Sequence, residues 1–126
     1  MNRNMPHLFL EYTDNLLEEP DFANLFSKCH LLLTEIAKAD PRACKSRATK
    51  ITAFFTGSGE PKDAFIHLHV LLASGRSSET KKELGTALLS LFKNEFAERL
   101  KNHDLQITIH VDEFDKDFYF KFPSSV

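Results

Sequence analysis

A chain of 126 residues with 42% hydrophobic residues, 12 Phe and 27% charged residues is long enough for one compact domain and too short for two. The net charge of −2 and the pI near 6.3 argue against a protein that binds nucleic acid or an anionic membrane surface. Cys29 and Cys44 are too few for a disulfide framework, so we expect free thiols in a cytoplasmic protein.

The first predicted element is a strand over residues 7–13, in which apolar and polar side chains alternate before the turn at Asp14-Asn15. Its short apolar run is interrupted by Glu11, which makes it neither a secretory signal nor a membrane-spanning helix. Apolar residues then recur at spacings of three and four over residues 22–36. This spacing, with Asp21 before it and Pro41 beyond it, predicts the first helix.

Two strands are predicted next, over residues 45–56 and 64–73, and the Gly-rich break at residues 57–61 between them indicates a hairpin. The second of these strands carries apolar residues on both faces, so we expect it to be central and buried. A second amphipathic helix is predicted from Ser77 to about Leu100, and a last strand over residues 105–111. The aromatic tail over residues 114–122 needs a partner surface, in its own domain or on a neighbouring subunit.

The element order is therefore β-α-β-β-α-β, an α+β fold with no linker. Two architectures fit this order. One is a ferredoxin-like sandwich; in the other, two βαβ units pack side by side with two helices on one face of a mixed four-stranded sheet, and oligomerisation covers the remaining surface. The 12 Phe and the apolar tail of so small a chain favour the second.

Met5-Pro6-His7 precedes the first strand, and Pro6 has chemistry available only if it becomes the N-terminal residue. A free prolyl amine is a general base, whereas the nitrogen of an amide-bonded proline has neither a proton nor a usable lone pair. We therefore treat residues 1–5 as an N-terminal extension and residues 6–126 as the domain.

Cationic residues occur at two strand–loop junctions. Arg76 lies in the small-residue segment between the third strand and the second helix, where backbone N–H groups suit a carboxylate or phosphate. Lys45 and Arg47 should project from one strand face and could hold a second carboxylate. The alternatives left open are a capped turn with an exposed arginine and a solvated basic strand edge.

His67 and His69 share one strand face, as two metal ligands would. The sequence places no third Cys, Asp or Glu near them. We therefore expect a half-buried histidine pair and no metal site.

Taken together, the chain from Met5 to about Phe122 resembles the 5-carboxymethyl-2-hydroxymuconate isomerase family of the tautomerase superfamily. The resemblance is carried by Met5-Pro6-His7, Glu11 with Asp14-Asn15, Leu25-Phe26-Ser27-Lys28, Lys45-Ser46-Arg47, Ala64-Phe65-Ile66-His67 and Gly75-Arg76-Ser77. No single motif is diagnostic, but their order and spacing are fairly specific.

The resemblance implies a tautomerase-like fold, a homotrimer and a cofactor-independent isomerase of the homoprotocatechuate branch of aromatic catabolism. It implies that Pro6, exposed by removal of the residues before it, is the acid/base catalyst that ketonises a dienol polycarboxylate. Arg76 matches a family arginine that handles the substrate's carboxylates, and Lys45 and Arg47 match a family Arg-Ser-Arg run. Lys45 departs from that run, and a lysine cannot form a planar bidentate clamp, which leaves the substrate open.

Two other functions stay open. A catalytically inactive member of the fold could bind small carboxylates or be structural, and a ferredoxin-like RNA-binding module shares the element order. The acidic pI and the lack of an aromatic RNA-binding strand motif count against the second.

Overall fold

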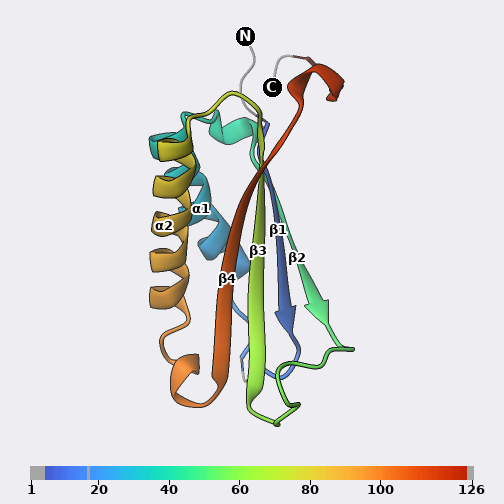
Figure 1. The fold of residues 1–126 in the computed structure, drawn as a ribbon, viewed down its shortest axis with the longest axis vertical. Helices are drawn as coiled ribbons and strands as arrows, with labels where there is room; N and C mark the ends of the chain where they lie inside the picture. Colours follow the sequence, from blue (N-terminus) through green and yellow to red (C-terminus); the bar gives the residue numbers. More distant parts are fainter. Residues whose placement is uncertain (1–4, 17, 125–126) are drawn as a thin grey trace.

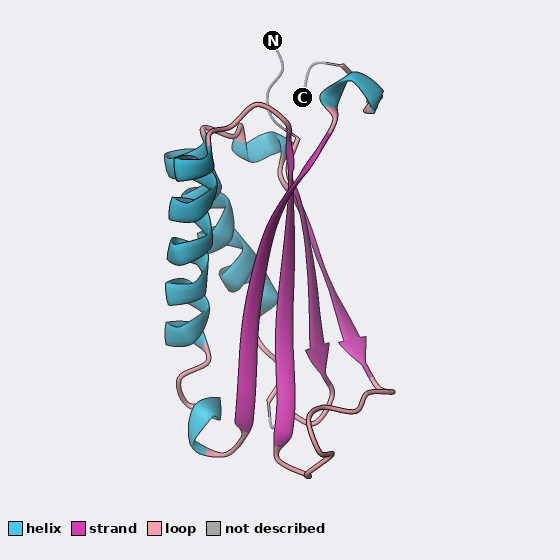
Figure 2. Cartoon of the chain, in the orientation of Figure 1, coloured by secondary structure: helices cyan, strands magenta, loops and turns pink. Residues whose placement is uncertain are grey.

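The computed structural model describes residues 5–16 and 18–124, and residues 1–4 of the predicted N-terminal extension lie outside them. The strands are β1 (His7–Thr13), β2 (Lys45–Ile51), β3 (Asp63–Ala73) and β4 (Asp104–Phe114), and the helices are α1 (Phe22–Ala37) and α2 (Ser78–Glu95). Short 3-10 turns occupy Pro41–Ala43, Arg99–Lys101 and Lys116–Phe118. Both helices cover the same face of the sheet (Figures 1 and 2), which confirms the predicted α+β order.

The strand order in the sheet is β2-β1-β3-β4, with β1 parallel to β2, β3 parallel to β4, and β1 antiparallel to β3. The two strands of each βαβ unit are therefore direct neighbours. A ferredoxin-like sheet instead splits each βαβ unit by an intervening strand, so this strand order excludes that alternative.

The predicted hairpin between the second and third strands is wrong. β1 lies between β2 and β3, so residues 52–62 cross the end of β1 rather than closing a tight turn. β2 also ends at Ile51 rather than near residue 56, because its partner β1 ends at Thr13, the residue paired with Ile51. Beyond that pair no strand is available to accept or donate the ladder hydrogen bonds.

α2 ends at Glu95 rather than near Leu100. Phe96 is fully buried and its ring packs on Phe92, with ring centroids 5.9 Å apart. The Arg99 guanidinium lies over the Phe96 ring and donates to the Glu18 carbonyl, at 2.7 Å from Nη2. These contacts turn the chain out of the helix axis and into β4.

The hydrophobic core lies between the helices and one face of the sheet. The largest of its fully buried side chains are Phe92, Phe96, Leu8, Leu10, Leu25, Leu33, Ile66, Leu68, Leu72, Leu84, Leu88 and Val70. Alternate residues of each strand point into it. Strand β3 is central as predicted, but within this chain it is buried on its helix side only.

The other side of the sheet, which the helices leave uncovered, is called here the open face. Strand register arranges its side chains in rows across the four strands, beginning with the row Lys45, His7, Leu71 and Asp112. The next row is Arg47, Phe9, His69 and His110, followed by Thr49, Glu11, His67 and Thr108.

Phe118, Phe120 and Phe122 of the aromatic tail are more than three quarters exposed, whereas Tyr119 stacks on Phe114 with ring centroids 4.4 Å apart. The tail therefore packs on its own domain only in part. Within the described residues, neither helix has the length and apolar character needed to cross a membrane.

Candidate functional site

The four residues predicted to carry function lie at one end of the sheet. β1 and β2 begin there, at His7 and Lys45, and the Lys45 backbone N–H donates at 3.1 Å to the carbonyl of Pro6, the residue before β1. β3 and β4 end there, and Arg76 lies three residues beyond the end of β3. They do not all lie on the same side of the sheet, however. Pro6 is buried on the helix side, whereas His7, the next residue, and Lys45 and Arg47 project from the open face.

Pro6 is buried immediately before β1, and its nitrogen is bonded to Met5. Leu8, on the same side of the strand, is fully buried in the core. The position is thus fixed by strand pairing on one side and by packing on the other. An amine created there would sit in a partly desolvated environment, which lowers an amine's pKa because burial disfavours the charged form.

Arg76 leaves β3 through Gly75, whose φ of 121° is a conformation that residues with a Cβ rarely adopt. Its guanidinium turns back over the fold: Nε donates to the Ala37 carbonyl at 3.0 Å and Nη1 to the Ala73 carbonyl at 3.1 Å. Burial lowers the pKa of Arg76, and Glu113 and Cys44 oppose that shift. An arginine nevertheless stays charged at neutral pH.

The segment between β3 and α2 ends in a capped turn, one of the alternatives that the sequence left open. The Ser77 hydroxyl accepts from the Thr80 backbone N–H at 3.1 Å, so it satisfies one of the unpaired donors at the start of α2. Arg76 is half-buried rather than an exposed side chain on a plain turn. It ties the end of α1 to the end of β3.

Arg47 and His7 form a contact on the open face that sequence reasoning did not foresee. Arg47 Nη1 lies 3.1 Å from His7 Nδ1, and its guanidinium carbon lies 4.2 Å from the centre of the Phe9 ring. Because a guanidinium only donates, Nδ1 must accept, and the proton of neutral His7 is on Nε2, 2.7 Å from the Tyr119 hydroxyl. Burial, Arg47 and Lys45 all lower the pKa of His7.

A hollow of about 460 Å³ opens on the open face beside this contact. Its lining includes Arg47, the aromatic ring of Phe9, and the ionisable side chains of Glu11, His67, His69, His110 and Asp112. Arg47 is the one predicted site residue that lines it. The hollow is therefore an extension of the cationic strand edge and not a pocket around Pro6.

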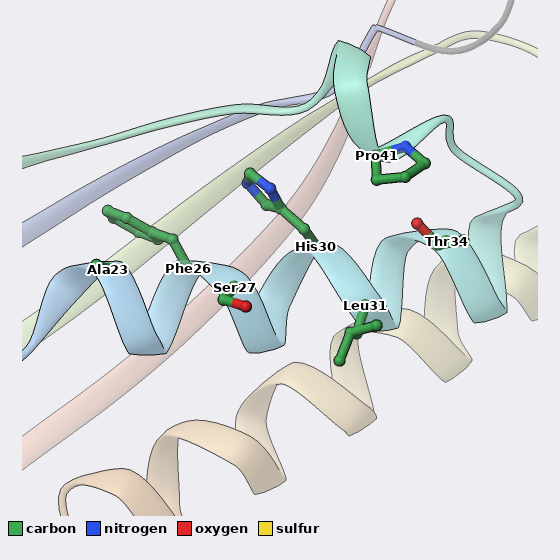
Figure 3. Close-up of a pocket in the computed structure, with 7 residues that line it drawn as sticks. All are labelled: Ala23, Phe26, Ser27, His30, Leu31, Thr34 and Pro41. Atoms are coloured by element: carbon green, nitrogen blue, oxygen red, sulfur yellow. The ribbon is translucent and has the colours of Figure 1, made fainter.

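A second hollow of about 480 Å³ lies along α1 (Figure 3). Apolar side chains dominate it, and His30 is its one ionisable residue, with Nε2 lying 2.7 Å from the Ser46 hydroxyl. None of the four predicted site residues lines this hollow. Its polar lining residues are Ser27, His30 and Thr34, with no carboxylate, lysine or arginine among them to bind a charged substrate.

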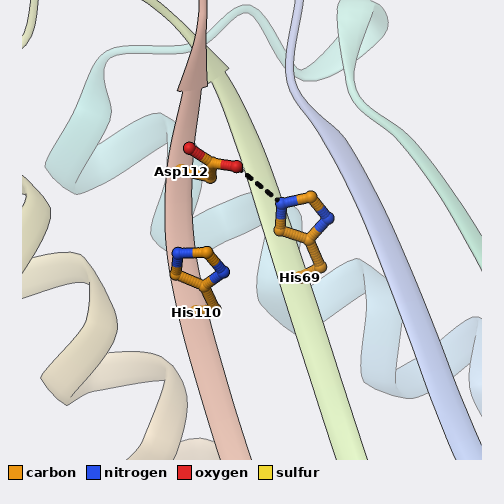
Figure 4. Close-up of side chains that lie close together, drawn as sticks. All are labelled: His69, His110 and Asp112. Atoms are coloured by element: carbon orange, nitrogen blue, oxygen red, sulfur yellow. Dashed lines mark hydrogen bonds and ion pairs between the residues drawn. The ribbon is translucent and has the colours of Figure 1, made fainter.

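His67 and His69 do share one face of β3, as predicted, but they have different partners. His67 Nδ1 lies 2.6 Å from the Thr108 hydroxyl, and His69 Nε2 lies 3.1 Å from an Asp112 carboxylate oxygen. Hydrogen bonds from His69 and from the Glu113 backbone hold the pKa of Asp112 below its ordinary value. His69, His110 and Asp112 form a compact cluster (Figure 4) that the sequence alone did not reveal, because it depends on the β3–β4 register.

Partly buried histidines should make the fold less stable in mild acid. Burial lowers the pKa of His30 below 6.5, so the unfolded chain binds the proton more tightly, and stability falls as pH drops through 6.5 towards the lowered pKa. We expect His30→Gln to lose less of its thermal unfolding midpoint between pH 7 and pH 5 than the parent protein loses. Carboxylates with lowered pKa values, such as Glu19, act below this window. If the unfolding midpoint of His30→Gln fell with pH as much as that of the parent, His30 would not be a cause of the lower stability in acid.

Comparisons with known proteins agree on the family. A family model described as 5-carboxymethyl-2-hydroxymuconate isomerase matches residues 6–124. The 5-carboxymethyl-2-hydroxymuconate Delta-isomerase of Escherichia coli is 27% identical over 117 residues, which cover 93% of both proteins. A 5-carboxymethyl-2-hydroxymuconate isomerase from Deinococcus radiodurans R1 superposes with a TM-score of 0.84 at 36% identity, covering 94% of this chain and 90% of that one.

More distant structures share the fold. A protein described as a fused 4-OT wild type symmetric trimer superposes with a TM-score of 0.74 at 15% identity, covering 94% of this chain and 93% of that one. An identity this low shows the fold alone. Together with the strand order, these similarities confirm the tautomerase fold that the sequence predicted.

Proposed function

The chain belongs to the 5-carboxymethyl-2-hydroxymuconate isomerase family, and from this membership we propose that it is a cofactor-independent isomerase. Its substrate would be a dienol polycarboxylate such as 5-carboxymethyl-2-hydroxymuconate, and its product the keto isomer. The observation that carries the proposal is that the family match covers residues 6–124 and begins at Pro6.

In this proposal the working protein starts at Pro6, so that residues 6–126 form the active domain without the extension. The free amine of Pro6 takes the proton of the enol hydroxyl, the electron pairs shift along the diene, and the resulting ammonium returns the proton to a carbon of the same molecule. No atom is gained or lost. The buried position of Pro6 supports this role, because burial lowers an amine's pKa from about 7.7–8.0 towards a neutral base at working pH.

Arg76, Arg47 and Lys45 would bind the carboxylates and stabilise the negative charge that develops on the dienolate. Charged donors in a partly desolvated site act more strongly than in water, and the contribution is largest where charge appears in the transition state. The half-buried Arg76 suits this second task, whereas the exposed Lys45 and Arg47 suit substrate capture.

We further propose that the active form is a cytoplasmic homotrimer. The fused 4-OT structure of the same fold is described as a symmetric trimer. Uncovered apolar surface supports association here too: Phe9 is 37% exposed on the open face, and Phe118, Phe120 and Phe122 are more than three quarters exposed. Size-exclusion chromatography with light scattering tests the number of subunits directly.

The function is tested by adding 5-carboxymethyl-2-hydroxymuconate to a chain that starts at Pro6 and following the loss of the conjugated dienol absorbance. Conversion at rates above those of buffer supports the isomerase. A carboxylate that raises the unfolding temperature while no conversion occurs would instead identify a binding protein that has lost the reaction.

Replacing Arg47 should affect substrate capture more than chemistry. We expect Arg47→Ala to raise KM by about tenfold and to leave kcat nearly unchanged, because the lost interaction is made equally in the ground state and the transition state. Lys50→Ala is the matched control, since Lys50 lies on the same strand and pairs with Glu19 at 3.3 Å. Steady-state kinetics on both variants decide the point. A drop in kcat alone would move Arg47 from capture to catalysis.

A further inference from the structure

Strand register brings His69, His110 and Asp112 together on the open face. His69 and His110 are paired residues of β3 and β4, and their rings stack with centroids 5.3 Å apart at an interplanar angle of 19°. Asp112 lies two residues further along β4 and therefore on the same face. Figure 4 shows the three side chains adjacent to one another on these two strands.

The donor atoms of this cluster are close enough to share one ion. One ligand atom from each residue lies within 4.8 Å of the other two, and His69 Nε2 lies 3.1 Å from Asp112 Oδ2. Ligands of a tetrahedral zinc ion, at 2.0–2.2 Å from the metal, are separated by about 3.3–3.6 Å. Small rotations of exposed or half-exposed side chains would close the difference, and the strands that carry them need not move.

The nearest cationic side chain in the same row is separated from the cluster by an aromatic ring. The Arg47 guanidinium lies over the Phe9 ring, and Phe9 in turn stacks on His69 with ring centroids 5.8 Å apart. Arg47 therefore does not contact the histidines that would bind the ion. The cluster lines the hollow of about 460 Å³, which also contains Glu11.

We propose that His69, His110 and Asp112 form a binding site for a divalent transition-metal ion, with Zn²⁺ as the best match. Two imidazoles and one carboxylate are the donor set that such ions prefer, whereas Mg²⁺ and Ca²⁺ prefer oxygen ligands throughout. The site lies on the opposite side of the sheet from Pro6. It therefore does not contact the proposed catalytic amine, although it shares the hollow with Arg47, which the proposed function assigns to substrate capture.

Titration calorimetry of the chelator-treated full chain with Zn²⁺ tests the site. We expect saturable binding of one ion per chain and at least about a tenfold weaker association in His110→Ala and in Asp112→Ala, because loss of mere supporting residues around a metal already costs 10–100-fold. His67→Ala is the matched control: it removes an imidazole from the same face of β3 that bonds Thr108 and is outside the cluster. It should bind Zn²⁺ like the parent.

Thermal unfolding of the same proteins provides a second measurement. Zn²⁺ should raise the unfolding midpoint of the parent and of His67→Ala, but not of the two cluster variants, whose midpoints without metal show that they are folded. The proposal is overturned if the parent shows no saturable Zn²⁺ binding, if both cluster variants keep the parent affinity, or if His67→Ala weakens binding as much as they do.

Discussion

A chain that begins at Pro6 is expected to ketonise 5-carboxymethyl-2-hydroxymuconate at least about 100 times more efficiently, in kcat/KM, than a chain that retains the residues before it. General acid–base catalysis contributes about 10²–10⁴-fold, and all of it is lost when the base has no lone pair to offer. An amide-bonded Pro6 is such a group. Stopped-flow absorbance of the dienol measures the difference.

The sharpest comparison adds a single residue. A chain that begins at Met5 differs from the Pro6 form by one residue, yet its Pro6 nitrogen is an amide. Matching unfolding midpoints would show that both forms are folded, so that a rate difference reports the amine. Pro6→Ala in the trimmed chain keeps a primary amine and should fall between the two. Equal rates from the Met5 and Pro6 forms would refute Pro6 as the catalyst.

Intact mass of the protein isolated from its native cell complements the kinetics. The proposed mechanism requires a species that starts at Pro6. If the only form present retains residues 1–5 and is active, another group must move the proton.

Arg76→Ala is expected to lower kcat/KM by about 10²–10³-fold, the usual cost of removing one donor that stabilises developing negative charge. The same change removes the donors to the carbonyls of Ala37 and Ala73, at 3.0 and 3.1 Å. Leaving partly buried acceptors without partners costs about 1–3 kcal/mol of unfolding free energy. One substitution is therefore expected to lower both activity and stability. Urea unfolding measures the loss of stability, and kinetics recorded at temperatures well below the unfolding transition measure the loss of activity.

Two further variants identify the cause. Arg76→Lys keeps the positive charge but cannot bridge two carbonyls with a planar fork, so it should recover activity in part and stability little. Arg42→Ala is the control substitution at another arginine, because the Arg42 side chain is 75% exposed and pairs with Asp40 at 3.4 Å. An Arg76→Ala enzyme that is less stable but fully active would make Arg76 a structural residue only.

Local patterns predicted the elements well, because each depends on its own residues. The three-and-four spacing of α1 and the Asp21 side chain, which accepts from the Asn24 backbone N–H at 3.1 Å, are both visible in the sequence. The pairing of strands was harder to predict. A Gly-rich break between two strands indicates a hairpin locally, yet β1 occupies the position between β2 and β3, and only long-range burial decides that.

In the candidate site too, the order of residues along the chain was predictable, whereas contacts between distant residues were not. That Arg76 follows β3 was predictable from order alone, but that its side chain returns to the end of α1 was not. His7 and Arg47 are 40 residues apart, and their contact depends on the parallel register of β1 with β2. The His110-x-Asp112 spacing within β4 is visible in the sequence, but the approach of both residues to His69 depends on the β3–β4 register, which the sequence does not reveal.

The crowded end of the sheet has a practical consequence for handling the protein. Pro6, the start of β2 and the aromatic tail after β4 all lie at that end (Figure 1), so an affinity tag or dye fused after the tail would crowd the proposed catalytic amine, and one fused to Pro6 itself would convert that amine into an amide. The glycine turn at residues 57–61 is exposed and lies at the far end. Labels for single-molecule work or surface immobilisation belong there, where loop tips tolerate insertion.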